Sequence, residues 1–108
     1  MKRSGKVFIK DKLAGFIRES EGEFSFEYDK SYLKNPIHGA VSKTLPLSKN
    51  VFTDKNVMPF FDGLIPEGWL LNVAVKNWKL DPRDRMGLLL TICKDCIGAV
   101  SIVKIEND

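Results

Sequence analysis

Apolar residues recur at helical spacing in the middle of the chain, before and after a Pro-Glu-Gly turn at residues 66–68. Before the turn they follow the i, i+3, i+4, i+7 pattern of one helix face. These positions are Val57, Phe60, Phe61 and Leu64. Thr53 is the expected N-cap of this first helix, and Asp54 would lie in its first turn, where a carboxylate complements the helix dipole.

A second helix is predicted after the turn. Its apolar stripe consists of Leu71, Ala74, Val75 and Trp78. At about 100° per residue, Trp69 projects to nearly the opposite side of this helix. Tryptophan is enriched among the residues that dominate binding energy in interfaces, which favours contact with another protein. The alternative is that Trp69 folds back as a cap over the helix pair, since Val73 and Leu80 share its side.

The first third of the chain has the alternation of short strands. Strands are predicted at residues 6–10, 13–17 and 24–28, with Phe24, Phe26 and Tyr28 on one face of the third. Residues 11–12 have the length of a tight hairpin turn, although they lack the Gly or Asn that such a turn prefers. The second turn, around Gly22, is polar, and its three glutamates are interpreted as a solvated edge. They are Glu19, Glu21 and Glu23.

The remaining elements complete an α+β pattern. Asp29 is expected to cap a single helical turn, and residues 38–48 are expected to be irregular or an edge strand. Asp81 as N-cap and Pro82 at the first position start a third helix. Its stripe is Met86, Leu89, Leu90 and Cys93. Residues 97–103 form an apolar, central strand. The prediction is a small antiparallel sheet, made of an N-terminal meander plus a C-terminal strand, with about three helices packed on it.

Length and charge limit the class of protein. A chain of 108 residues has the size of one domain, residues 1–108. The net charge of +3 is mild, and no block of like charge marks an arm that binds nucleic acid directly. No stretch reaches the roughly 20 apolar residues that span a bilayer, and no signal peptide is recognisable. Two cysteines without a secretion signal are typical of a reducing compartment, which predicts a cytoplasmic protein.

Candidate chemistry is sparse. Cys93 and Cys96 form a CxxC, but a zinc site needs four ligands, and the only other soft ligand is the distant His38. A redox pair favours a helix N-terminus, whereas this pair lies at the C-terminus of a predicted helix. Phosphate-binding glycine motifs are absent. The sequence therefore predicts a protein that is not an enzyme and holds no cofactor or metal. A small thiol-redox domain and an RNA-binding domain remain as alternatives, the latter because aromatics alternate near lysines.

Three motifs, in this order, resemble the N-terminal subdomain of HipA-type serine/threonine kinases. They are TLPLS at residues 44–48, FFDGLIPEG at 60–68 and KDCIGAV at 94–100. The resemblance covers nearly the whole chain, from the strand at Val7 to the strand at Val100. It implies a small α+β unit that packs against a separate kinase core. In that family the kinase is the toxin of a toxin–antitoxin system and acts on an aminoacyl-tRNA synthetase.

The kinase part of the family has no counterpart before the last residue, Asp108. A free-standing copy is similar to the small subunit of a split system, HipS, whose kinase is HipT and whose DNA-binding partner is HipB. The resemblance implies a non-catalytic antitoxin that binds and neutralises a HipT-like serine/threonine kinase, with a HipB-like protein in the same complex. The alternative is an accessory subunit that completes the kinase without inhibiting it.

The expected kinase contacts lie in the turn and the second helix. A domain normally covered by a kinase core would carry an apolar docking face once separated from it. The contacts predicted for that face are Ile65, Pro66, Glu67, Gly68, Trp69 and Val73. Trp69 is the expected anchor.

Overall fold

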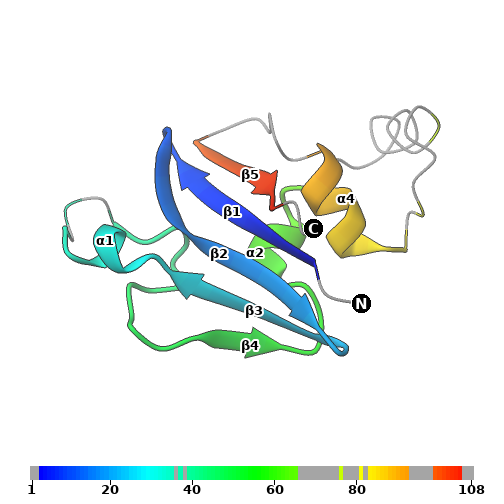
Figure 1. Ribbon diagram of the computed structural model, residues 1–108, viewed down its shortest axis with the longest axis horizontal. Coiled ribbons are helices and arrows are strands. Elements are labelled where there is room, and N and C mark those ends of the chain that lie inside the picture. The colour runs from blue at the N-terminus through cyan, green and yellow to red at the C-terminus, as the bar shows by residue number, and fades with distance from the viewer. Residues whose placement is uncertain are drawn as a thin grey trace.

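The computed structural model describes residues 3–35, 37, 39–65, 76, 81, 83–92 and 99–105. Within them, the strands β1 (Arg3–Ile9), β2 (Lys12–Ser20), β3 (Glu23–Tyr28), β4 (Phe52–Asp54) and β5 (Val100–Lys104) form one antiparallel sheet in the order β4-β3-β2-β1-β5 (Figure 1). The described helices are α1 (Lys30–Leu33), α2 (Pro59–Asp62) and α4 (Arg85–Ile92). The predicted α+β class, with a meander and a C-terminal strand in one sheet, is confirmed.

Both turns of the meander place two residues at positive φ, as a tight type I′ hairpin requires. Lys10 (φ 47°) and Asp11 (φ 71°) connect β1 to β2, one residue earlier than predicted. Glu21 (φ 50°) and Gly22 (φ 78°) connect β2 to β3. The left-handed conformation is unfavourable for residues with a Cβ, and Lys10 is of a type that seldom adopts it. The first turn therefore carries backbone strain.

One face of the sheet carries the core. Val7 pairs with Ile102, and Ile17 pairs with Phe26, so that four strands contribute fully buried side chains to the same face. Phe26 and Tyr28 are buried there and Phe24 packs against them, as the alternation in the third strand predicted. Helices α2 and α4 contact each other, and α4 also packs against β1 and β5 (Figure 1).

The first central helix begins later than predicted. Thr53 and Asp54, the expected N-cap and first-turn residues, belong to strand β4, and α2 starts at Pro59 with Met58 as its N-cap. Phe52 pairs with Phe26 in β3, which draws this segment onto the sheet. Proline has no backbone N–H to donate and is accepted at the first helical position but not inside a helix. The apolar stripe is nevertheless buried or partly buried, as predicted.

Helix α4 also starts later than expected. The predicted N-cap, Asp81, instead closes a turn by accepting from the backbone N–H of Arg83 at 2.9 Å. Asp84 occupies the N-cap position of the helix, because its Oδ1 accepts from the backbone N–H of Gly87 at 3.1 Å and its carbonyl accepts from that of Leu88. Met86, Leu89 and the neighbouring apolar residues of the helix are buried in the core.

The C-terminal strand lies at the edge of the sheet, which corrects its predicted central place. In the described residues β5 pairs with β1 alone, and Val103 is 36% exposed while Ile102 is fully buried. An apolar run indicates a strand, but it does not distinguish a central strand from an edge strand that buries one face.

The opposite face of the sheet is covered by no helix among the described residues (Figure 1). Phe16 lies there, partly buried, between Lys6 on β1 and Glu27 on β3. The guanidinium of Arg18 lies over the Phe16 ring, 4.9 Å from its centroid, and donates to Glu27 Oε1 at 3.1 Å. This face, with Val103 beside Lys6, is called the open face below.

Strain at the first turn predicts a stabilising change. Replacing Lys10 with Asn and Asp11 with Gly, the pair that type I′ turns favour, should raise the free energy of unfolding by about 1 kcal/mol. Urea unfolding followed by circular dichroism measures the effect. The matched control is Asp11→Ala, which removes the same side chain but still places a Cβ at positive φ, and should give no gain. A loss of stability in the Asn-Gly variant would contradict the turn geometry.

Candidate functional site

The structure places one of the six predicted kinase contacts. Ile65 follows α2 and is 2% exposed, so its side chain belongs to the core of this domain. The other contacts lie outside the described residues. They are Pro66, Glu67, Gly68, Trp69 and Val73. Their assignment stays a prediction.

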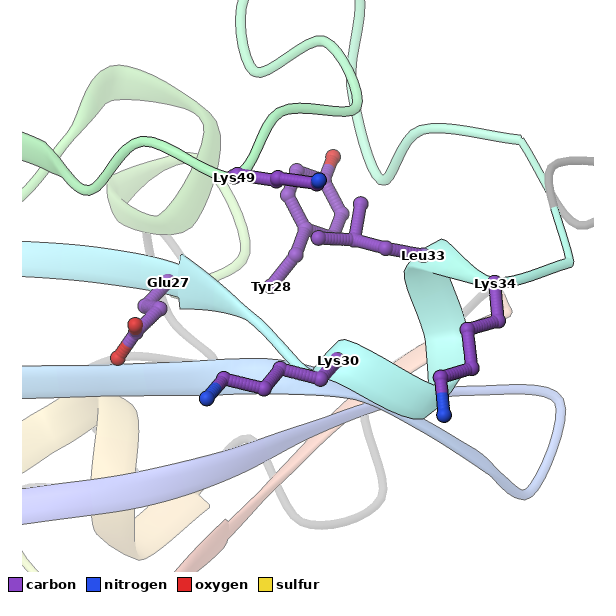
Figure 2. A pocket seen from close by; sticks show the side chains of 6 residues that line it. All are labelled: Glu27, Tyr28, Lys30, Leu33, Lys34 and Lys49. Atoms are coloured by element: carbon purple, nitrogen blue, oxygen red, sulfur yellow. The ribbon is translucent and has the colours of Figure 1, made fainter.

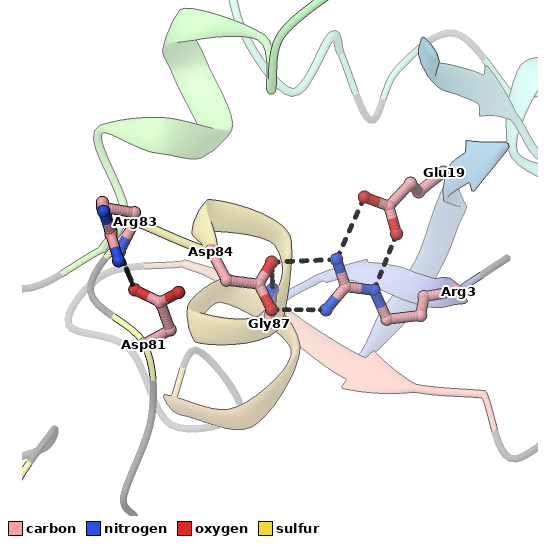
Figure 3. A network of polar contacts seen from close by, with 6 residues as sticks. All are labelled: Arg3, Glu19, Asp81, Arg83, Asp84 and Gly87. Atoms are coloured by element: carbon pink, nitrogen blue, oxygen red, sulfur yellow. Dashed lines mark hydrogen bonds and ion pairs between the residues drawn. The ribbon is translucent and has the colours of Figure 1, made fainter. Parts of the chain in front are cut away.

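A cluster of charged side chains surrounds Arg3 at the start of β1. Figure 3 shows the Arg3 guanidinium between the carboxylates of Glu19 and Asp84, with two hydrogen bonds to each. The bonds to Glu19 measure 2.7 and 3.0 Å, and those to Asp84 measure 2.7 and 2.8 Å. Such two-pronged pairs are the strong form of the arginine–carboxylate contact. One side chain thereby joins β1, β2 and the start of α4.

Hydrogen bonding within the cluster fixes the charges of Arg3 and Asp84. Hydrogen bonds to Asp84 and then to Glu19 raise the pKa of Arg3, and the hydrogen bond from Arg3 lowers the pKa of the Asp84 carboxyl, with burial acting in the opposite direction in each case. Asp84 is therefore ionised at neutral pH and acts only as an acceptor. A second close approach shows how tight the site is, because a Cβ on Gly87 would clash with Asp84 Oδ2.

Sequence reasoning missed this cluster and misplaced Glu19. Glu19 was expected on a solvated edge, but its side chain is 14% exposed and paired with Arg3. Glu21 and Glu23 are exposed, as predicted. The register of β1 against β2 is the signal that could have revealed the Arg3–Glu19 pair. Arg3 and Glu19 are cross-strand partners on the two strands of the first hairpin, where opposite charges stabilise each other.

A polar hollow of about 510 Å³ adjoins the cluster. Arg85 Nε donates to Asp62 Oδ1 at 2.6 Å across this hollow, joining α4 to α2. Its lining residues are Glu19, Phe24, Asn56, Val57, Asp62, Arg83, Asp84, Arg85 and Met86. The carboxylates in it are engaged by arginines, so the arrangement suits fixing helices onto the sheet better than transferring a proton.

The described residues contain no group of three or more His, Cys, Asp or Glu side chains that could hold a metal ion. His38, Cys93 and Cys96, considered above for zinc or redox chemistry, lie outside the described residues. No described helix has the length and apolar character needed to cross a bilayer.

The aromatic residues of the third strand serve the core. Phe26 is fully buried, and Tyr28 is 2% exposed with its ring edge against Phe26 at a centroid distance of 4.8 Å. Burial raises the pKa of Tyr28 above its ordinary value, although a hydrogen bond from the Val41 backbone acts in the opposite direction. These rings are not displayed for stacking on nucleic-acid bases, which weakens the RNA-binding alternative.

Comparison with known proteins gives a family and a fold. Residues 5–103 match the family model for the HipA N-terminal domain. A solved structure described as the N-terminal domain of HipA toxin superposes with a TM-score of 0.74 at 28% sequence identity, covering 98% of this chain and 95% of that chain.

Two relatives differ in how much of their length the match occupies. An uncharacterized protein of Haemophilus influenzae is 33% identical over 100 residues, which cover 93% of this chain and 91% of that protein. A candidate kinase of Sinorhizobium fredii, Y4mE, is 25% identical over 93 residues, which cover 86% of this chain but 22% of that protein. The same domain is thus nearly all of one relative and about a fifth of the other.

Removing the central cation of the cluster tests its structural role. Arg3→Met leaves two partly buried carboxylates without their partner and should lower the free energy of unfolding by about 1–3 kcal/mol at pH 7. The matched control is Arg83→Met, because Arg83 is 92% exposed and reaches Asp81 only at 3.5 Å. Its loss should stay within about 0.5 kcal/mol. Equal losses in the two variants would contradict the role given to Arg3.

The free energies of unfolding of wild type and Arg3→Met should depend differently on pH. The pKa of Asp84 is lowered in the folded state, so its contribution to stability is present above the unfolded pKa of about 4 and is lost as pH falls through the folded value. The stability difference between wild type and Arg3→Met should therefore be full at pH 7 and shrink below about pH 4. Urea unfolding at a series of pH values measures it, and a difference independent of pH would exclude the ionised pair as its source.

Proposed function

The chain belongs to the HipA N-terminal domain family, as its three motifs predicted, and from this premise we propose that it is a non-catalytic antitoxin that binds and neutralises a HipT-like serine/threonine kinase. Membership of this family supports a toxin–antitoxin context. The kinase partner, its neutralisation and the place of this chain in a HipBST-type complex are the proposal.

The observation that carries the proposal is the contrast between the two relatives. In the Sinorhizobium fredii candidate kinase the matching region is 22% of the protein, whereas in the Haemophilus influenzae protein it is 91%. A domain that is joined to a larger chain buries part of its surface against that chain. When the same domain occurs separately, that surface is available to rebind the larger partner as a second subunit.

The predicted contact segment begins where the described core ends. Ile65 is buried, and Leu64 before it is partly buried, so the chain is fixed to the core immediately before residue 66. A segment that starts from a fixed point loses less conformational entropy when it docks than a free one. Trp69 is the proposed anchor, because large aromatic side chains in desolvated pockets dominate binding energy.

The open face is a second surface that a partner could cover. Phe16 and Val103 contribute apolar area there, and Arg18 and Glu27 neutralise each other beside them. An apolar centre with paired charges around it resembles the composition of a protein interface. Separate variants can therefore decide which of the two surfaces meets the kinase.

The proposal assigns no reaction to this chain. The charged cluster around Arg3 has its hydrogen bonds committed to holding β1, β2 and α4 together. Neutralisation would act by covering the kinase or by holding it inactive. A HipB-like DNA-binding protein would join the same cytoplasmic complex, and no direct contact of this chain with nucleic acid is proposed.

The first experiment is capture of partners from the native host with this protein as bait, followed by mass spectrometry and a growth assay. A HipA-like kinase should be retained, and co-expression of this chain should rescue growth of cells that express the kinase. Retention without rescue would replace the antitoxin by an accessory subunit that completes the kinase. Retention of no kinase would contradict the proposal.

A variant tests the anchor. Trp69→Ala should weaken binding to the captured kinase by about 2–4 kcal/mol, a loss of about 30-fold or more, because truncating an interface tryptophan empties its pocket. Isothermal titration calorimetry with the purified kinase measures the loss, and thermal unfolding checks the fold.

Two control variants complete that test. Val51→Ser alters an apolar side chain that is 48% exposed and should change neither affinity nor stability. Phe16→Ser alters the open face. If Phe16→Ser weakens binding while Trp69→Ala does not, the open face is the docking surface and the anchor assignment is wrong. Unchanged affinity with a lower melting temperature in Trp69→Ala would place that side chain in the core.

A further inference from the structure

We propose that a hollow beside α1 binds an acidic segment of a partner protein, with one apolar side chain of that segment held between lysines. The hollow has a volume of about 470 Å³, within the range of ligand-binding pockets. Its lining consists of Glu27, Tyr28, Lys30, Leu33, Lys34 and Lys49 (Figure 2). It lies at the end of the sheet away from α4 (Figure 1). The inference does not depend on the kinase proposal.

The floor of this hollow is apolar and held in place. Figure 2 shows the side chain of Leu33 directed toward the ring of Tyr28. The Tyr28 hydroxyl donates to the carbonyl of Leu45 and accepts from the backbone N–H of Val41 at 3.0 Å. The Tyr28 ring also stacks on Tyr32 at a centroid distance of 6.0 Å. Because these contacts fix the floor before any ligand arrives, binding there costs little reorganisation.

The rim of the hollow carries uncompensated positive charge. Lys30, Lys34 and Lys49 are exposed, and the ion pairs among the described residues are made by arginines rather than by these lysines. Glu27, the acidic member of the lining, already pairs with Arg18 at 3.1 Å. Three exposed lysines therefore line the hollow beside its apolar floor. Its complement is an apolar side chain flanked by carboxylates.

A second, smaller hollow extends the basic end of the molecule. It has a volume of about 240 Å³ and is lined by Ile9, Lys10, Lys12, Tyr32 and Ile37. Helix α1 contributes to both hollows, through Leu33 in the first and Tyr32 in the second. Ile37 is 84% exposed beside this second hollow. An extended peptide could thus meet alternating apolar and basic positions across α1.

The chemistry of the hollow favours a protein segment over nucleic acid. Tyr28 is 2% exposed and Tyr32 is 4% exposed, and the two rings stack on each other, so neither offers a face to a base. The basic groups are lysines, which act as point charges and lack the planar fork with which arginine grips phosphates. An apolar floor accepts a leucine or similar side chain.

The test uses a fluorescein-labelled eight-residue peptide with a central leucine flanked by glutamates, titrated with the full chain and followed by anisotropy. The matched peptides replace the glutamates by glutamines or the leucine by serine. We expect both replacements to weaken binding at least about fivefold, and added salt to weaken it as well. Equal binding of the glutamine peptide would overturn the role of charge, and equal binding of the serine peptide would overturn the role of the floor.

Charge-reversal variants locate the site. Lys30→Glu, Lys34→Glu and Lys49→Glu, made together, should weaken peptide binding about tenfold or more, since each change removes an attraction and adds a repulsion. The control reverses three exposed lysines elsewhere and so has the same net charge. It consists of Lys6→Glu, Lys55→Glu and Lys104→Glu, and it should lose less than threefold. Equal losses would show long-range attraction without a site and overturn the proposal.

Two further measurements use the wild-type chain and therefore test the proposal even if the variants do not fold. Amide chemical shifts of the wild-type chain, recorded during peptide titration, should move at Lys30, Leu33 and Lys49. Shifts confined to other regions would place the peptide elsewhere and overturn the proposal. A thymidine octanucleotide should compete poorly with the peptide. Competition at equal concentration would make this a nucleic-acid surface and exclude the assignment to an acidic protein segment.

Discussion

The contact on which the described fold depends is the one that Arg3 makes with two carboxylates. Glu19 is its cross-strand partner in β2, and Asp84 caps α4, more than sixty residues further along the chain. The N-terminus of a helix leaves backbone N–H groups that need partners, and the Asp84 carboxylate accepts from one of them, that of Gly87. Arg3 holds this carboxylate and that of Glu19 at once, and Gly87 leaves the space in which Asp84 can turn toward Arg3. The first strand and the last described helix are therefore fixed to each other by charge as well as by the apolar core.

Periodicity predicted the fold class because each element of the meander buries one face. Phe26 and Tyr28 alternate with polar residues, and that pattern determines which side of β3 faces the helices. The boundaries were less predictable where two patterns competed. Thr53 and Asp54 have the properties of a helix start, but pairing of Phe52 with β3 and the missing N–H of Pro59 moved the start of α2 to Pro59. Tertiary pairing outweighed local preference there, as it often does in short helices.

The candidate sites differ in whether a short stretch of sequence is enough to predict them. A docking tryptophan is a local signal, because its side of a helix follows from spacing, and Trp69 could be proposed from spacing alone. The Arg3 cluster and the hollow beside α1 are not local. Arg3 meets Asp84 only after the sheet and α4 have formed, and Lys49 joins Lys30 only because the loop before β4 returns to α1. Scattered lysines with a net charge of +3 gave no hint that several of them gather at one end.

The two ends of the sheet differ in chemistry because one end carries arginines and the other carries lysines. At the α4 end, Arg3 and Arg85 bind carboxylates at 2.6 to 3.0 Å and leave those carboxylates satisfied. At the α1 end, lysines surround an apolar floor that Tyr28 holds rigid, and their charges have no partner among the described residues. Arginine forks suit permanent internal contacts, whereas hydrated, flexible ammonium groups suit contacts that form and break. The contacts that hold the fold and the hollow proposed for an acidic segment thus lie at different ends of this small domain.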